Sequence, residues 1–546
     1  MAPDGTPNAG GRNAEHAARR TSSCAFADNV AAVAMRAYDA VLAHLADRDP
    51  SRSTERGQTV LAAVVARDAR CEPPRLRVVS LGTGTKFLCA ADIDADALSG
   101  TKVRDCHAEV LARRGMKRFL YAQIRAARRL YLPRDAEDAN ARSNAPGVAE
   151  DEEERWLVLE PVPGVAPTRW RVKEEVSFHL YTSSAPCGNA TVKRWARGAK
   201  ETFDDTLGPF ALPARTPGND EHDKRHNSFG SIAEGQLAFL WKRDPFESEK
   251  TAGDVRAEVA RRPRGPVPAD AVPPGTSTRG RVLTCSDKLA VWSCVGVQGA
   301  LLLARGFLAE PVRFASVTVG RKFNRAIGRR ALCCRMRRFA GNARFPFVPP
   351  NRALSTPESE PARGFCGGGL LSGTAHHPTL MCTAAPFDAG RYAEGEGADF
   401  GSGEAVVAWL GNDAADGDDV RELAAAAELL NGRTGERVPV PPRKTKNDDE
   451  DEGSDPATED GEAATTVSGV SRAALAAAHA ESEVPSTAGV WAPSAAPGSG
   501  DSAYAALKAE AGASSGYTEA KREALSLPGL WSLSVPHLCA STTTPT

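Results

Sequence analysis

The sequence has no long apolar run and almost no excess charge of either sign. Its longest apolar stretches, such as residues 300–304, fall far short of the roughly 20 residues that a membrane-spanning helix needs. The first thirty residues lack the positive region and apolar stretch of a secretory signal. A formal net charge of −1 means that any surface for nucleic acid has to be a local patch. These absences predict a soluble protein of the cytoplasm or nucleus that has no membrane partner. The alternative is an organellar protein with a transit peptide in residues 1–23.

The chain contains 12 cysteines but no feature that would place them in an oxidising compartment. In a chain of 546 residues without a secretory signal, a disulfide framework is not expected. The cysteines are therefore predicted to be reduced, and some of them are available as metal ligands. No protein partner can be inferred.

Apolar periodicity predicts alternating helices and strands, which is typical of a layered α/β fold. Helices are expected over 28–45, 106–124 and 286–303, and strands over 75–79, 176–181 and 312–319. Residues 1–27 are predicted to be disordered, and 28–540 to form one domain. Low-complexity insertions are predicted at about 136–154, 261–280, 349–369 and 440–468, because polar, acidic or Pro- and Gly-rich segments bury too little apolar surface to order.

Two short motifs carry metal-site chemistry. His107-Ala108-Glu109 at a helix start places an imidazole and a carboxylate two residues apart, and Pro186-Cys187 ends a strand. One His, two Cys and a water are a catalytic zinc pattern, and H-x-E with P-C-x-x-C is the signature of zinc nucleobase deaminases. Here the second Cys of that signature is replaced by Ala190. Cys285, in a polar turn that opens a helix, is the best candidate for the missing ligand.

Each motif has a plainer interpretation when it is taken alone. His-x-Glu occurs often by chance, and a lone Cys is more often a small buried hydrophobic residue. That is the prediction for Cys106, Cys294, Cys333 and Cys334. The metal-site pattern is specific because the segments around His107, Cys187 and Cys285 occur together and in this order.

At these residues the chain resembles a known family, the adenosine deaminase domain shared by RNA-editing adenosine deaminases and a tRNA-specific adenosine deaminase. The resemblance spans roughly 28–540 without the insertions. The segments that carry it are LGTGTK (81–86), DCHAEVLARRGMKRFLY (105–121), FHLYTSSAPCGNA (178–190), CSDKLAVWSCVGVQGALL (285–302) and LLSG (370–373).

The resemblance implies a role for each matched residue. The zinc ligands correspond to His107, Cys187 and Cys285, and the residue that moves protons corresponds to Glu109. Thr85 and Lys86 match positions near the bound nucleotide. The implied fold is a cytidine-deaminase-like three-layer α/β/α sandwich with a mixed sheet.

The family also buries an inositol hexakisphosphate, and a buried polyanion needs inward-facing cations. The residues carried over to that site are Arg113, Arg114, Lys288, Trp292, Tyr504, Lys508, Tyr517, Lys521 and Trp531. Without the resemblance, Arg113 and Arg114 would equally fit a solvated helix face. This chain departs from the family pattern at Val291, where the family has an arginine, and lacks the lysine expected near Ser534. Either the ligand is held less tightly or another base substitutes.

RNA is the predicted partner. Residues 321–344 contain basic side chains and no acidic one, which suits contact with phosphates, although a basic solvated helix is the alternative. The residues before the first predicted helix are too few for a double-stranded RNA-binding domain, so tRNA, at the adenosine 3′ of the anticodon, is the expected substrate. The alternatives are editing of other RNAs, action on free nucleosides or cytidine, and an inactive RNA-binding paralogue.

Overall fold

The computed structural model describes the elements that surround the predicted site. The described residues are 25–49, 59–88, 90–132, 156–188, 190, 238–240, 266–268, 282–323, 328, 331–333, 336, 376–383, 385–387, 403–411, 419–439, 467–482 and 501–526. Of the predicted insertions, 136–154 and 349–369 lie outside this part of the chain.

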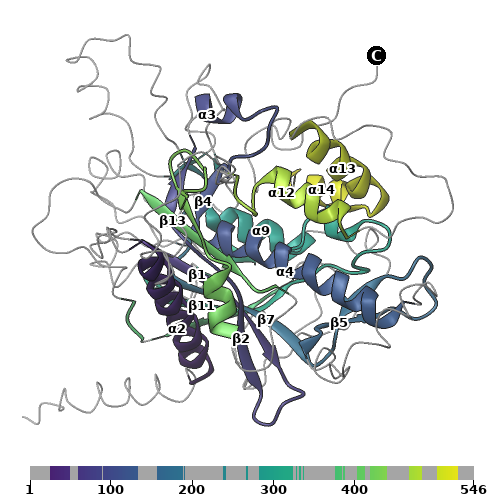
Figure 1. The fold of residues 1–546 in the computed structure, drawn as a ribbon, viewed down its shortest axis with the longest axis horizontal. Coiled ribbons are helices and arrows are strands. Elements are labelled where there is room, and N and C mark those ends of the chain that lie inside the picture. Colours follow the sequence, from purple (N-terminus) through teal and green to yellow (C-terminus); the bar gives the residue numbers. More distant parts are fainter. Residues whose placement is uncertain are drawn as a thin grey trace, which may run out of the picture.

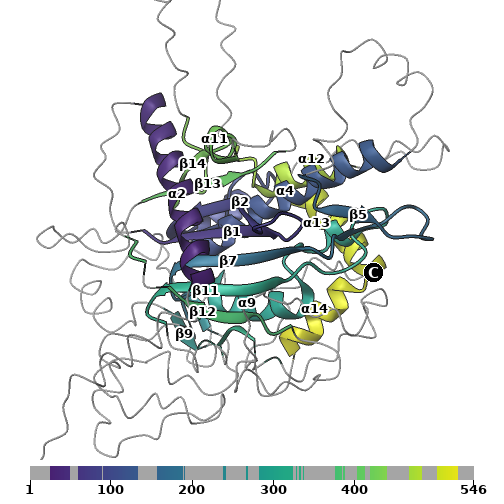
Figure 2. The same cartoon turned by 90° about the horizontal axis from the view of Figure 1, so that it is seen from below.

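A seven-stranded mixed sheet forms the centre of the protein, in the order β12-β11-β7-β1-β2-β13-β14. Strands β7, β11 and β12 pair in parallel, and the other neighbours are antiparallel. Figure 2 shows the strands stacked in this order. Their bounds are β1 Leu61–Asp68, β2 Arg75–Thr83, β7 Val176–Ser184, β11 Phe314–Arg321, β12 Thr379–Cys382, β13 Glu404–Trp409 and β14 Glu428–Asn431. The central strands are buried almost throughout, as expected for a sheet covered on both faces.

Helices pack against this sheet. In Figure 1, α2 lies to the left of the strands, and α4 and α9 lie to their right. Helix α4 contacts β1, β2 and β13, and the C-terminal helices gather beside α4 and α9. The bounds are α2 Ala25–Arg48, α3 Ala90–Ala95, α4 Ala108–Tyr131, α9 Cys285–Val295, α11 Asp419–Ala425, α12 Arg472–Ala480, α13 Asp501–Ser514 and α14 Tyr517–Ser526. A short 3-10 helix, η5, spans Leu301–Leu303.

Small accessory sheets lie around the main one. Strands β3 (Thr85–Phe87) and β4 (Asp105–His107) form an antiparallel pair, and β4 leads directly into α4. Strands β5 (Leu159–Pro161) and β6 (Trp170–Val172) form a second pair, and β8 (Ala238–Leu240), β9 (Pro266–Pro268) and β10 (Val282–Leu283) form a third sheet. Within the described ranges, no helix is both long enough and apolar enough to cross a membrane.

The predicted α/β class is confirmed, but several predicted boundaries are wrong. Helix α2 begins at Ala25, inside the segment predicted to be disordered, because Phe26 is buried with its ring 4.8 Å from that of His179. Strand β9 lies inside the predicted insertion 261–280. The predicted insertion 440–468 ends early, since Ser468 is buried and donates to the Glu428 carboxylate at 2.6 Å.

Two predicted helices also have different limits. The helix predicted over 106–124 starts only at Ala108, because 105–107 pair with β3. The helix predicted over 286–303 stops at Val295, where Gly296 takes a φ of 81°. Gly296 has no Cβ, so it can adopt this left-handed conformation and end the helix.

A buried ion pair attaches α11 to the edge of β2. The guanidinium of Arg77 lies 2.5 Å from the Asp419 carboxylate and 3.6 Å from the centre of the Trp156 ring. The side chain of Arg77 is only 1% exposed. We expect Asp419→Ala to lower the free energy of unfolding by about 3–5 kcal/mol, because it leaves a buried guanidinium without its carboxylate.

Chemical denaturation of the two variants Asp419→Ala and Val420→Ala measures this effect. Val420 is the next residue on α11 and is 42% exposed, so its truncation should change stability little. Similar free energies of unfolding for both variants would show that the ion pair does not stabilise the fold.

Candidate active site

The start of α4 brings the predicted catalytic and substrate-binding residues together. His107 is the last residue of β4, and Glu109 lies in the first turn of α4. In the antiparallel pair of β3 and β4, Thr85 is paired with His107, and Lys86 with Cys106. Paired residues have Cβ atoms about 4.5–5.5 Å apart. Thr85 and Lys86 are half-buried. Because successive strand residues point to opposite faces, Thr85 shares the face of His107, and Lys86 shares that of Cys106.

A buried carboxylate orients His107. Asp105 Oδ1 lies 2.6 Å from His107 Nδ1, and Asp105 Oδ2 accepts a hydrogen bond from the Lys288 ammonium. Burial works against ionisation of Asp105, but the charges of Lys288 and His107 hold the pKa of this carboxyl below its usual range. Because an ionised carboxylate only accepts, His107 Nδ1 donates, and its Nε2 is the ring nitrogen left for another partner.

The protonation of His107 follows from the same contact. Burial alone would lower the pKa of the imidazole, but the charge and hydrogen bond of Asp105 outweigh it and raise the pKa to about 9. The Cys187 thiolate raises it further. His107 therefore lies within electrostatic reach of both Asp105 and Cys187.

The two distant cysteines meet at the start of α9. The backbone N–H of Cys285 donates to Cys187 Sγ at 3.3 Å, and the N–H of Ser286 donates to the Cys187 carbonyl at 3.1 Å. A helix N-terminus favours negative charge. A hydrogen bond from the Cys285 thiol, with the charge of His107, lowers the pKa of Cys187 despite its burial. The same hydrogen bond, together with burial, raises the pKa of Cys285 well above its usual value.

Glu109 carries a charge that reaches both thiols. It is 4% exposed, and its charge acts against ionisation of both Cys187 and Cys285, although the hydrogen bond between them is the larger influence on each. The structure thus brings three of the predicted residues, His107, Glu109 and Cys285, within electrostatic reach of the fourth, Cys187.

The donor types at this site fit a zinc ion. One imidazole and two thiols are zinc ligands, and a His that donates its other N–H to a carboxylate is the usual support for such a ligand. As the side chains are placed in the described ranges, no three of the His, Cys, Asp and Glu groups form a closed metal-binding set. The fit therefore rests on the chemistry of the donors and on the contact between Cys187 and Cys285.

Gly188 makes the contact between the two cysteines sterically feasible. Its φ is 94°, and a Cβ there would overlap the Thr284 hydroxyl and lie 2.8 Å from Ser286 Oγ. Thr284 is the N-cap of α9 and donates its hydroxyl to Asp287 Oδ2 at 2.6 Å. The turn after Cys187 can reach α9 only because residue 188 has no side chain. The sequence prediction did not include Gly188 or Thr284.

A second site, a cavity lined with cations, lies further along the same two helices. It is a space of about 490 Å³, partly open to solvent, between α4, α9, α13, α14 and the segment 299–301. Its lining includes six of the residues predicted for inositol hexakisphosphate, namely Arg113, Trp292, Tyr504, Lys508, Tyr517 and Lys521. The other lining residues are Lys117, Val291, Gly299, Ala300 and Leu301, so no lining residue is acidic.

The cations of this cavity act on one another. Burial lowers the pKa of Lys117 to about 8, and Arg113, Arg114 and Lys508 contribute to that shift. Burial would raise the pKa of Tyr504, but the charges of Lys117, Lys508, Arg114 and Arg472 lower it to about 7. Such a concentration of positive charge favours binding of an anion.

Of the other three residues predicted for the polyanion, two do not line the cavity and one is not described. Lys288 pairs with Asp105 at the active site, and Arg114 donates to the Val470 carbonyl at 2.8 Å, so neither lines the cavity. Trp531 lies outside the described residues. Conversely, the sequence prediction did not include Lys117 and Arg472. Lys117 follows Arg113 by one helical turn, and this spacing could have indicated it.

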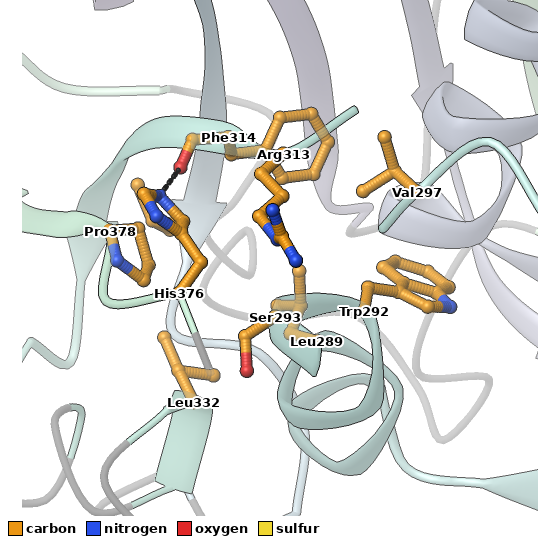
Figure 3. A pocket seen from close by; sticks show the side chains of 10 residues that line it. Leu289, Trp292, Ser293, Val297, Arg313, Phe314, Leu332, His376 and Pro378 are labelled. Atoms are coloured by element: carbon orange, nitrogen blue, oxygen red, sulfur yellow. Dashed lines mark hydrogen bonds between the residues drawn. The ribbon is translucent and has the colours of Figure 1, made fainter. Parts of the chain in front are cut away.

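A smaller, mostly apolar pocket lies on the other side of Trp292. Figure 3 shows the His376 ring donating to the Phe314 carbonyl, at 2.8 Å, beside Arg313. Burial, with a contribution from Arg313, lowers the pKa of His376 to about 3. A neutral His376 and the apolar lining make this pocket part of the packing around Trp292.

The basic run predicted to contact RNA is described only at its start. Arg321 ends β11, and its carbonyl accepts from Ala185 N–H in the turn that leads to Cys187. This contact places the start of the run next to the active-site turn. The basic residues from 325 to 344 lie outside the described part. Of the cysteines predicted to be small core residues, Cys106, Cys294 and Cys333 are buried, and Cys334 is not described.

The family profile of the adenosine-deaminase (editase) domain matches residues 80–137 and 148–364. The matched residues include His107, Glu109, Cys187 and Cys285, which the fold brings together. The chain belongs to the adenosine-deaminase (editase) domain family.

Relatives in this family carry two kinds of name. The mouse double-stranded RNA-specific adenosine deaminase is 28% identical over 60% of this chain and 22% of its own length. The mouse tRNA-specific adenosine deaminase 1 is 27% identical over 56% of this chain and 68% of its own length. The fruit-fly double-stranded RNA-specific editase Adar is 28% identical over 51% of this chain and 32% of its own length. The matched region thus spans about a fifth of the first of these proteins.

The steric role of Gly188 can be tested against a second glycine. Gly164 also has a positive φ, 73°, but a Cβ there would meet nothing within 4 Å. Alanine is strained by the backbone at both positions, and only at Gly188 does it also overlap Thr284. We expect Gly188→Ala to lower the free energy of unfolding by about 1–3 kcal/mol more than Gly164→Ala, as measured by chemical denaturation. Equal losses would mean that the turn can move away from α9 freely.

Proposed function

We propose that this protein is a zinc-dependent hydrolase that converts adenosine to inosine in RNA. The contact between Cys285 N–H and Cys187 Sγ supports this most directly, because it joins two cysteines 98 residues apart. His107 and Glu109 lie close enough for their charges to act on Cys187. Family membership supports the same chemistry.

His107, through Nε2, and the thiolates of Cys187 and Cys285 would hold the metal. Zinc bound by three protein ligands lowers the pKa of a coordinated water toward neutrality. Asp105 keeps Nδ1 of His107 protonated and thereby directs Nε2 toward the thiols. The first turn of α9 stabilises negative charge on Cys187.

Glu109 is placed to move protons. It is buried in the first turn of α4 beside the thiols, so its carboxylate can accept a proton from water without being a ligand. Water adds at C6 of adenosine, and Glu109 delivers protons to the ring and then to the departing ammonia, which leaves inosine. Thr85 and Lys86, opposite His107 and Cys106, would contact the nucleotide. An inactive RNA-binding protein would have no need of Glu109.

The cation-lined cavity would hold inositol hexakisphosphate as a structural cofactor. Its phosphates would neutralise Arg113, Lys508 and Lys521, which come from three different helices. Neutralisation would join α13 and α14 to α4. For the complete domain we propose the cytidine-deaminase-like three-layer arrangement of this family.

For the RNA substrate we propose tRNA, at the adenosine 3′ of the anticodon. The mouse tRNA-specific adenosine deaminase 1 is among the relatives that the chain matches, at 27% identity over 56% of this chain. A base that is already unpaired in a loop is also the least costly to flip. Editing of other structured RNA is the second candidate, since identities to both branches are similar.

Two variants separate metal binding from proton transfer. We expect Glu109→Ala to retain about one zinc per chain and its RNA affinity while losing deamination by roughly 10²–10⁴-fold. Cys285→Ala should lose both zinc and activity. Zinc content by elemental analysis and inosine formation in RNA are the measurements. An active Glu109→Ala enzyme, or a fully metallated Cys285→Ala enzyme, would refute the assigned roles.

The substrate assignment predicts faster deamination of folded tRNA than of a long perfect duplex. Both RNAs are compared under single-turnover conditions at one salt concentration, because affinity for RNA depends strongly on salt. Neutralising Arg329, Arg330, Arg337 and Arg338 together should weaken tRNA binding and flatten its salt dependence. Faster reaction of the duplex would move the protein to the double-stranded RNA branch.

A further inference from the structure

Lys117 is a buried cation in the cavity between α4, α9, α13 and α14. It is 5% exposed and lines the cavity together with Arg113, Lys508 and Lys521. It lies near the middle of α4, where the residues around it pack into the hydrophobic core. A lysine at such a position needs a specific explanation, since lysine is almost never fully buried unless it is paired.

The position of Lys117 on the helix directs it to the same point as Arg113. The two residues are four apart, so they lie on one face of α4. A Cβ built on Gly299 would lie 3.3 Å from Arg113 Nη2 and 3.9 Å from Lys117 Nζ. Gly299, with a φ of 80°, thus lies beneath both cationic groups, which are adjacent at the cavity wall.

No carboxylate is among the main charged groups that act on this lysine in the part of the chain that the structure describes. The charged groups that act on it are Arg113, Arg114 and Lys508, and they oppose its charge, as burial does. Tyr504, whose pKa is lowered to about 7 by nearby cations, favours the charge of Lys117. Removing an ammonium from water without a counter-charge is costly. A phosphate-rich ligand in the cavity would remove that cost.

Val291 explains why an additional cation is needed. It lines the same cavity from α9 and is 4% exposed. It is the position at which the family pattern has an arginine, so α9 contributes no charge there. Lys117 and Val291 therefore lie on facing helices, α4 and α9, around one space. The charge absent from α9 is present on α4.

We infer that Lys117 replaces the cation missing at position 291 and binds a phosphate group of the polyanion in this cavity. This inference rests on the proposed inositol hexakisphosphate site. It moves one phosphate contact from α9 to α4 and makes Lys117 a ligand-binding residue of this chain. Because Lys117 is remote from His107 in the helix, its role is in holding the cofactor.

The test compares retention of inositol hexakisphosphate by the full-length protein and its variants. Lys117→Met keeps an unbranched side chain, one atom shorter, and removes the charge. Lys117→Met with Val291→Arg returns a cation from the other helix. We expect the single variant to release the ligand about ten- to a hundredfold more readily, as for loss of a charge-assisted hydrogen bond. The double variant should regain most of the loss. Native mass spectrometry during dialysis gives the ligand bound per chain, and thermal unfolding gives an independent readout.

Lys102→Met is the matched control, because Lys102 pairs with the exposed Glu436 at 3.1 Å and does not line the cavity. It should retain the ligand as the unmodified protein does. Unmodified protein that binds no inositol phosphate would overturn the cofactor and the role of Lys117 together. Ligand in the unmodified protein with equal retention by Lys117→Met would overturn only Lys117. If the single variant does not fold, recovery of loaded protein by adding Val291→Arg supports the inference, and failure of that rescue overturns it.

Discussion

The active site depends on the two hydrogen bonds that the buried carboxylate of Asp105 accepts. It accepts from His107 Nδ1 and from the Lys288 ammonium, and so connects the start of α4 to the first turns of α9. A carboxylate buried without these partners would be destabilising. Paired with both, it orients the His107 ring and holds the helix that carries Cys285 next to the helix that carries Glu109.

Helices α4 and α9 each serve two sites. Their first turns carry Glu109 and Cys285, and later turns carry Arg113 and Trp292 at the cation-lined cavity. The guanidinium of Arg113 stacks over the Trp292 ring, 4.6 Å from its centre. This contact is a second link between the two helices, in addition to the one through Asp105. A polyanion in the cavity would therefore stabilise the elements that position the active site, although it would not touch the reacting atoms.

Much of the active site could be predicted from the sequence, because its chemistry is local. His107 and Glu109 are two residues apart, so any structure that begins a helix there presents both. Selection of Cys285 required only its polar, helix-opening context. The limits of the helices were harder to predict. The helix was predicted to begin at 106, but residues 105–107 pair with β3, and such pairing depends on a strand about twenty residues away in the chain.

The sequence by itself determined which groups are available: the imidazole, the carboxylate, the two thiols and the family to which the chain belongs. The tertiary structure decided which of the cations serve which site. Lys288 was predicted for the polyanion but pairs with Asp105, and Lys117, in an apolar helix face, lines the cavity. The physical reason is that the state of a buried charge depends on the distance to other charges and on its removal from water. Both are set by segments that are remote in sequence and adjacent only in the folded chain.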